Sequence, residues 1–149
     1  MKIQPAQQDD WSAIRAMLAA ATLPVADLGP DKLQEFLVAR DDVTGRDVVG
    51  LIGLERYGEM ALLRSLVVAP GERRSGLGAS LVGALEARAA QSEIRDLYLI
   101  TIDADSFFSR LGFAPVGRDR VPQAIRDTSE FSELCPIDAI VMRKVLRDT

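Results

Sequence analysis

Two arginines and two glycines stand between an apolar run and a long amphipathic segment near the middle of this 149-residue chain. The segment runs Arg73-Arg74-Ser75-Gly76-Leu77-Gly78-Ala79. A helix that begins here exposes unsatisfied N–H groups and the positive end of its dipole, and glycines let the backbone approach a ligand closely. Arginine side chains add charge-assisted contacts to anions. The pattern predicts a phosphate-binding loop, with a plain loop-to-helix turn as the alternative.

The spacing of these glycines differs from the two common nucleotide-binding motifs. Leu81 stands three residues after Gly78, where the dinucleotide fingerprint has Gly or Ala. No Gly-Lys-Ser/Thr follows, so the segment is not a P-loop either.

Glu55 is a candidate general base. It ends the apolar run Val48–Leu54, and a carboxylate at that place would accept a proton from a substrate ammonium, directly or through water. The alternative is an exposed strand-end carboxylate beside Arg56.

Arg64 and Ser65 are candidate substrate-binding residues, because they interrupt the apolar run Met60–Val68. Alternation along a strand points their side chains to opposite faces. An Arg64 that faces a cleft would bind a substrate carboxylate bidentately. An Arg64 that faces outward would instead pair with a surface acid.

Composition narrows the class of protein. The net charge of −4 disfavours a nucleic-acid partner, for which a basic domain is expected. The single cysteine, Cys135, permits no intrachain disulfide and favours a cytoplasmic location. Histidine is absent, which excludes Ser-His and Cys-His nucleophiles and makes zinc unexpected, so no metal site is predicted. We expect no signal peptide and no membrane-spanning segment.

Apolar periodicity and turn residues predict alternating strands and helices. The expected strands are Met1–Pro5, Phe36–Arg40, Val48–Arg56, Met60–Val68, Leu97–Thr101, Phe113–Val116 and Ala139–Val145. The expected helices begin at an N-cap Asp9 or Asp10, at Asp31, at Gly76 and at Ser106, with short ones at Pro122–Asp127 and Ser129–Leu134. We therefore predict one α+β domain over residues 1–149, with a mixed, mainly antiparallel sheet of six to seven strands flanked by helices.

The polar stretch Gly117–Pro136 has two interpretations. It carries Arg118, Arg120 and Arg126 among acidic residues, and it either forms a wall of an acceptor site or is a solvated loop of mixed charge. Cys135, within it, is either a thiol near the substrate or a small buried hydrophobe.

Two motifs resemble the GNAT acetyltransferase superfamily. Leu66-Val67-Val68-Ala69-Pro70 followed by Arg73-x-x-Gly76-x-Gly78 is similar to its acetyl-CoA signature. Phe107-Phe108-Ser109-Arg110-Leu111-Gly112-Phe113 resembles the family's aromatic–Tyr–x–x–Leu-Gly-Phe segment after the fifth strand. The resemblance implies acetyl-CoA as cosubstrate, a small amine as acceptor, and direct attack of the amine on the thioester.

The same resemblance implies roles for individual residues. Backbone groups of Leu66, Val67 and Val68 would pair with the pantetheine arm and polarise the acetyl carbonyl. N–H groups from Arg74 to Ala79 would hold the pyrophosphate. Thr101 stands where many members carry an asparagine that contacts the cofactor, and its hydroxyl would be a weaker substitute.

Phe108 departs from the family pattern. By the resemblance it lies at a cofactor-binding position, where the family often has a tyrosine that reprotonates the leaving thiolate. Phenylalanine has no proton to donate. Two functions follow: an active N-acetyltransferase, or an acetyl-CoA-binding sensor or interaction module with weak turnover.

A narrower resemblance covers nearly the whole chain. Gly53-Leu54-Glu55, Leu62-Leu63-Arg64-Ser65-Leu66 and Leu134-Cys135-Pro136 are similar to the arsenic-resistance N-acetyltransferase subgroup. This implies detoxifying acetylation of an amino-acid-like toxin or organoarsenical, and the likeness also favours a homodimer.

Overall fold

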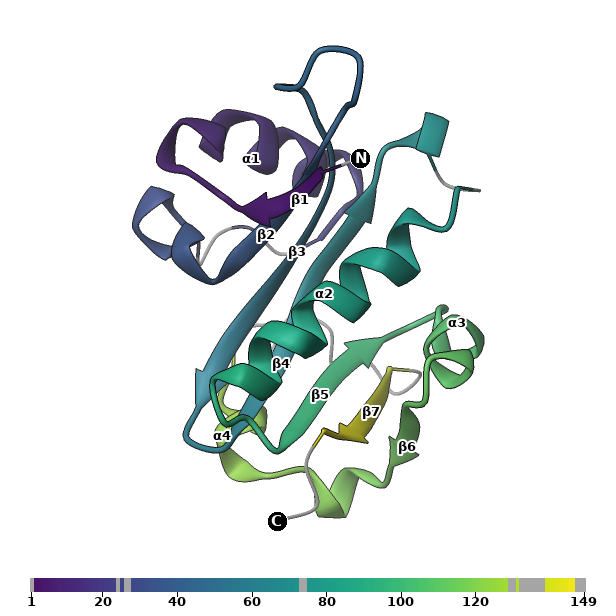
Figure 1. Cartoon of the computed structure of the whole chain (residues 1–149). Coiled ribbons are helices and arrows are strands. Elements are labelled where there is room, and N and C mark those ends of the chain that lie inside the picture. Colours follow the sequence, from purple (N-terminus) through teal and green to yellow (C-terminus); the bar gives the residue numbers. More distant parts are fainter. Residues whose placement is uncertain are drawn as a thin grey trace. The chain divides into compact units, whose positions relative to one another are not determined.

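The fold is taken from a computed structural model (Figure 1), which describes residues 2–23, 25, 28–72, 75–128, 131 and 139–146. Arg73 and Arg74 of the predicted phosphate loop lie outside the described residues, and so does Leu134-Cys135-Pro136. Most of the helix predicted at Ser129–Leu134 lies outside them too.

Seven strands form a sheet in the order β1-β2-β3-β4-β5-β7-β6 (Figure 1). Their bounds are β1 Lys2–Pro5, β2 Phe36–Arg40, β3 Val48–Tyr57, β4 Met60–Val68, β5 Asp96–Thr101, β6 Ala114–Val116 and β7 Ile140–Val145. Strands β4 and β5 pair in parallel, from Met60 opposite Asp96 to Leu62 opposite Tyr98. The pairs β1–β2, β2–β3, β5–β7 and β6–β7 are antiparallel. The predicted α+β class with a mixed, mainly antiparallel sheet is confirmed.

The helices also match the prediction, with shifts at their ends. They are α1 Trp11–Ala20, α2 Leu77–Gln91, α3 Asp105–Arg110 and α4 Gln123–Arg126, with 3₁₀ turns η1 Gln8–Asp10, η2 Pro30–Glu35, η3 Pro70–Glu72 and η4 Arg118–Arg120. The helix expected to begin at Asp31 is the 3₁₀ turn η2, which begins at Pro30 because proline suits a first helical turn. Helix α2 begins at Leu77 because Gly76, at φ +81°, is left-handed.

The chain forms two compact units. Unit 1 comprises Met1–Leu54 and Ser65–Ala87, and unit 2 comprises Glu55–Arg64 and Arg88–Thr149. Each is described separately below. The single domain expected from the sequence stays a prediction.

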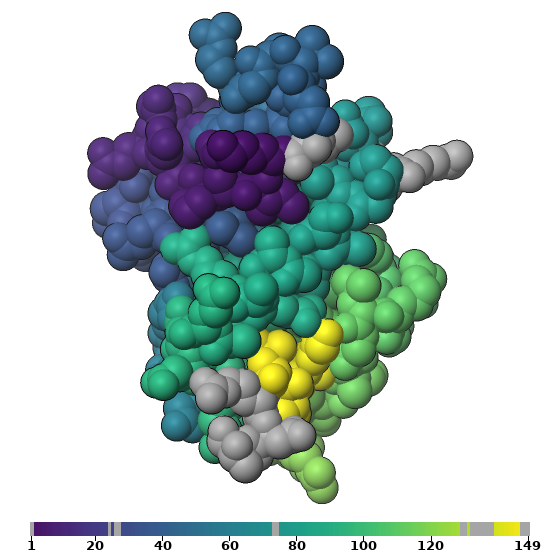
Figure 2. All heavy atoms as spheres, in the orientation of Figure 1, coloured from purple at the N-terminus to yellow at the C-terminus, as the bar shows by residue number. Residues whose placement is uncertain are grey.

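The core of unit 1 packs α1 against the first strands. Its members are all at most 1% exposed: Ile14, Leu18, Leu33, Phe36, Val38 and Leu51. Phe36 lies opposite Gly53 in the β2–β3 register, and a Cβ at Gly53 would stand 2.5 Å from Phe36 Cζ. Glycine is therefore required there for packing. The β2–β3 turn, residues 41–47, protrudes at the top of Figure 2. Val43, within this turn, is 92% exposed.

The core of unit 2 lies between strands and the segment after β6. Its buried members are Leu62, Tyr98, Ile100, Val121, Ile125, Ala139 and Val141. Arginines fix this segment through backbone carbonyls: Arg118 donates to Ala139 O at 3.3 Å, and Arg126 donates to Val121 O at 3.0 Å and to Arg118 O. Part of the polar stretch Gly117–Pro136 is thus packed on the sheet. The sequence left this stretch as either a solvated loop or a wall of the acceptor site.

Asp10 has a different role from the N-cap predicted for it. It occupies the N-cap position of α1 without a side-chain capping bond. Its carboxylate instead binds the Arg40 guanidinium through two hydrogen bonds of 3.0 and 2.8 Å and accepts the Gln7 N–H at 2.8 Å. Burial raises the pKa of Asp10, but the Arg40 and Gln7 hydrogen bonds outweigh it, so the pKa lies below its ordinary value.

We predict that Asp10→Asn lowers the free energy of unfolding at neutral pH by about 2–3 kcal/mol, because the mutation leaves Arg40 without its counter-charge. Because the pKa of Asp10 is lower in the folded state, its ionised carboxylate stabilises the fold at pH values above the unfolded-state pKa of about 3.9. This contribution disappears as the pH falls through the folded-state pKa. Urea unfolding across this pH range should therefore show less acid dependence in Asp10→Asn than in the wild type. The neighbouring exposed carboxylate provides the control, and Asp9→Asn should change stability by less than about 0.5 kcal/mol.

Candidate active site

Two donors hold the carboxylate of Glu55 in unit 2. Arg64 Nη1 donates to Glu55 Oε1 at 2.5 Å, and the Tyr57 hydroxyl donates to Oε2. Glu55 and Tyr57 are two residues apart on β3, so their side chains leave the same face of the strand. The two donors fix the orientation of the carboxylate, and each carboxylate oxygen keeps a second lone pair for another partner.

Burial differs sharply between the members of this ion pair. The Arg64 side chain is 0% exposed, whereas 22% of the Glu55 side chain is exposed. A buried guanidinium needs a counter-charge, and Glu55 supplies it. The sequence left Arg64 either facing a cleft or paired outward with a surface acid. The structure buries Arg64 and pairs it with Glu55, while Arg56 donates to Ser92 Oγ at 3.1 Å.

Sequence analysis missed Tyr57, because the predicted strand ended one residue earlier, at Arg56. Strand β3 extends to Tyr57 and places its hydroxyl on Glu55. The signal was the two-residue spacing, which puts both side chains on one face if the strand continues.

Ser65 interrupts β4 with a left-handed backbone. Its φ of +62° is uncommon for a residue other than glycine and marks local strain. Residues 61–65 are buried, whereas Leu66, Val67 and Val68 are half-buried. The left-handed residue therefore marks the change along β4 from fully packed residues to the three that are predicted to bind pantetheine.

The predicted phosphate segment opens α2 in unit 1. Ser75 and Gly76 are exposed, and Gly78 and Ala79 are half-buried within the first turn. Ser80 N–H bonds Gly76 O at 3.1 Å, and the first turn, all of it described, carries no acidic side chain. N–H groups at such a helix start attract anions. The local geometry suits the predicted pyrophosphate role, which stays a prediction.

The two remaining predicted residues take part in packing within unit 2. Thr101 is 8% exposed, and its hydroxyl accepts the Ala104 N–H at 3.0 Å just before α3. Phe108 is 6% exposed and forms edge-to-face contacts with Phe107 and Phe113, at centroid distances of 5.0 and 5.7 Å. Their predicted contacts with the cofactor stay predictions.

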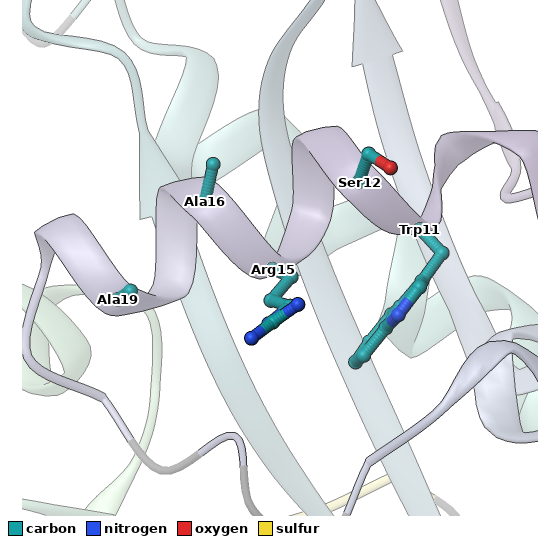
Figure 3. Close-up of a pocket in the computed structure, with 5 residues that line it drawn as sticks. All are labelled: Trp11, Ser12, Arg15, Ala16 and Ala19. Atoms are coloured by element: carbon teal, nitrogen blue, oxygen red, sulfur yellow. The ribbon is translucent and has the colours of Figure 1, made fainter.

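A pocket on α1 lies apart in sequence from every predicted site residue. Its lining is Trp11, Ser12, Arg15, Ala16 and Ala19, and Figure 3 shows the Trp11 and Arg15 side chains on the same side of the helix. Trp11 is half-buried: it packs against the unit 1 core and also lines this pocket.

Comparison with known proteins decides the family. Residues 32–115 match the acetyltransferase (GNAT) domain. An uncharacterized N-acetyltransferase of Chlorobaculum tepidum is 30% identical over 118 residues, which cover 78% of this chain and 74% of that protein. The chain belongs to the GNAT acetyltransferase family. Acetyl-CoA is the cosubstrate of this family.

Further GNAT relatives are longer proteins. Amino-acid acetyltransferases of Pseudomonas putida are 36% identical over 112 residues, 65% of this chain but only 26% of theirs. N-acetylglutamate synthase from Neisseria gonorrhoeae, complexed with coenzyme A and N-acetyl-glutamate, has a TM-score of 0.83 at 18% identity, over 98% of this chain and 35% of that chain. The chain thus spans about a quarter to a third of the length of these proteins, and the structural similarity shows the GNAT fold.

Among residues 2–23, 25, 28–72, 75–128, 131 and 139–146, no three His, Cys, Asp or Glu side chains are grouped as metal ligands. In the same part of the chain, no helix has the length and apolar character needed to cross a bilayer.

We predict that Glu55→Gln lowers the free energy of unfolding by about 1–3 kcal/mol, because it removes the carboxylate that lies 2.5 Å from the buried Arg64 guanidinium. The double variant Arg64→Met/Glu55→Gln should recover part of this loss, since a buried pair is often replaced by apolar groups at little cost. Urea unfolding of the single and double variants measures both effects. Wild-type stability in Glu55→Gln would contradict the counter-charge role.

We predict that Arg73→Glu weakens acetyl-CoA binding with little loss of stability, because it reverses a charge beside the predicted pyrophosphate position. Isothermal titration with acetyl-CoA measures the affinity, and thermal unfolding measures the stability. Arg15→Glu, an exposed charge reversal on α1, controls for the change in net charge. Equal affinities in Arg73→Glu and Arg15→Glu would remove Arg73 from the cofactor site.

Proposed function

We propose that this GNAT protein transfers the acetyl group of acetyl-CoA to the amine of a small, amino-acid-like acceptor, with Glu55 facing that amine. The observation that carries the proposal is the held but accessible carboxylate: two donors orient Glu55, and 22% of its side chain remains exposed at a strand whose preceding residues, 50–54, are buried. An oriented carboxylate in contact with solvent suits an ammonium group and the removal of its proton.

The proposed reaction is a direct displacement. Glu55, alone or through a water molecule, accepts a proton from the acceptor ammonium, and the nitrogen lone pair then attacks the thioester carbon. The C–N bond forms and the C–S bond breaks, with the backbone of Leu66, Val67 and Val68 polarising the carbonyl oxygen. CoA leaves as a thiolate, which is a tolerable leaving group because a thiol has a pKa of about 8.5. The acetylated nitrogen gives its second proton to water, and the thiolate takes a proton from water.

Arg64 and Tyr57 act through Glu55 in this proposal. Both donate to its carboxylate, and the buried Arg64 side chain is already committed to that contact. We therefore assign Arg64 to positioning Glu55, in place of the substrate-carboxylate contact suggested by the sequence. Ser65 keeps its predicted place beside the substrate.

The acceptor class is inferred from relatives. Pseudomonas proteins similar to this chain are named amino-acid acetyltransferases, and a structure that shares its fold is an N-acetylglutamate synthase. The sequence resemblance to the arsenic-resistance subgroup adds amino-acid-like toxins and organoarsenicals to the candidate acceptors. A cytoplasmic homodimer is proposed on the same resemblance, and size-exclusion chromatography with light scattering tests the dimer.

Phe108 supports a second candidate function, a sensor or interaction module that binds acetyl-CoA with weak turnover. Its ring is buried between Phe107 and Phe113, so no hydroxyl is available where the family often has one. The chain has only two tyrosines. Neither stands at the position of Phe108, since the Tyr57 hydroxyl donates to Glu55, and burial raises the pKa of Tyr98.

We predict acceptor-dependent release of free CoA thiol from acetyl-CoA. The panel contains amino acids, phosphinic and arsonic amino-acid analogues, polyamines and aminoglycosides. With the best acceptor, Glu55→Gln should reduce turnover by about 10²–10⁴-fold while acetyl-CoA affinity is unchanged. Tyr57→Phe should reduce turnover less, because Arg64 still orients the carboxylate. Assays run well below the unfolding midpoint of each variant, so that lost stability is not mistaken for lost catalysis.

Glu59→Gln is the matched control, since the Glu59 side chain is 72% exposed in the same unit. Wild-type turnover in Glu55→Gln would remove Glu55 from the mechanism. No thiol release from any amine, with acetyl-CoA still bound in a thermal-shift assay, would favour the sensor.

A further inference from the structure

A second pocket lies in unit 2, at the end of β6. Tyr98 of β5 and Arg143 of β7 contribute to its lining, together with Asp119 and Arg120 of η4. Pro115 and Val116 of β6 add an apolar wall. The pocket therefore combines opposite charges with a hydrophobic surface, and it contains no residue of the candidate active site.

Two of its charged side chains have no partner in the part of the chain that the structure describes. Neither Asp119 nor Arg120 has a side-chain hydrogen bond or ion pair there, and both are exposed. Arg143 is different, because its Nε and Nη2 donate to Asp96 Oδ1 at 3.0 and 2.6 Å. Its Nη1 group is not used by that contact and remains available to a ligand.

Tyr98 adds a neutral donor. It is 7% exposed, and its ring packs in the unit 2 core beside Leu62 and Val141. Burial raises the pKa of Tyr98, with Asp96 adding to the rise and Arg143 opposing it. The phenol therefore keeps its proton at neutral pH and can donate a hydrogen bond to an anion.

We propose that this pocket binds an α-amino acid with an apolar side chain, as its zwitterion. Arg120, Arg143 Nη1 and the Tyr98 hydroxyl bind the carboxylate. Asp119 binds the ammonium group, and Pro115 and Val116 contact the side chain. Each charged group of the ligand then contacts a residue of opposite charge. A simple anion would leave Asp119 without a partner, and a simple amine would leave Arg120 without one.

Isothermal titration of the full chain, without acetyl-CoA, tests the proposal with L-leucine as the probe. Isocaproate lacks the amine of leucine, and isoamylamine lacks its carboxylate. Each should bind about tenfold or more weakly than leucine, because isocaproate loses the contact with Asp119 and isoamylamine loses the contacts made by the carboxylate. Equal binding of all three compounds would overturn the zwitterion assignment, and so would the absence of leucine binding.

Two substitutions assign the contacts. Arg120→Gln should weaken leucine binding about tenfold or more and leave isoamylamine binding unaffected. Asp119→Asn should weaken leucine binding by a similar factor, but it should not weaken isocaproate binding. Tyr98→Phe should cause a smaller loss for leucine and isocaproate alone. Arg110→Gln, an exposed arginine of the same unit, is the matched control and should bind leucine as the wild type does.

Glu55→Gln separates this pocket from the proposed acceptor site. Leucine binding that is lost in Glu55→Gln but kept in Arg120→Gln and Asp119→Asn would overturn the proposal, because the amino acid would then occupy the acceptor site. Equal losses in Arg110→Gln and Arg120→Gln would also overturn it, since the effect would then be one of net charge. The binding assay needs no turnover, so its result is independent of the proposed acetyl transfer.

Discussion

The buried charge of Arg64 is the constraint on which the candidate acceptor residues depend. A guanidinium with no exposed surface is stable only beside a carboxylate, and Glu55 at 2.5 Å satisfies that requirement. The same contact holds Glu55 in one orientation, and the Tyr57 hydroxyl, on the same face of β3, donates a second hydrogen bond to the carboxylate. Stability and the proposed chemistry therefore depend on one ion pair, and we expect any substitution of Glu55 to affect both.

The packed core of unit 2 supports this arrangement from one side. Tyr57 packs against the cluster that includes Leu62 and Tyr98, while its hydroxyl reaches Glu55. The segment after β6 covers the same cluster through Val121 and Ile125, and arginine contacts to backbone carbonyls fix it there. The proposed amino-acid pocket lies against this cluster through Tyr98 and Val116, so it has a rigid wall.

Unit 1 contains the segments predicted to bind acetyl-CoA, and their predicted contacts come mainly from backbone groups. Gly76 adopts a left-handed conformation just before α2, and the helix start carries no acid that would compete with a phosphate. Ser65, also left-handed, precedes the half-buried Leu66–Val68 stretch. Both features agree with the acetyl-CoA roles implied by the family pattern, which direct binding measurements must test.

The sequence by itself determined the class of fold, the order of strands and helices, and the GNAT motifs, because these follow from local periodicity, turn residues and spacing. It also placed the start of α2 to within one residue, since the helix begins at Leu77, directly after Gly76. Only the tertiary structure decided the partner of Arg64, the hydroxyl contact of Tyr57 and the pairing of Asp10 with Arg40. Asp10 and Arg40 are thirty residues apart, and Glu55 meets Arg64 only across a hairpin. Such contacts depend on strand register and burial, which alternation along one strand does not specify.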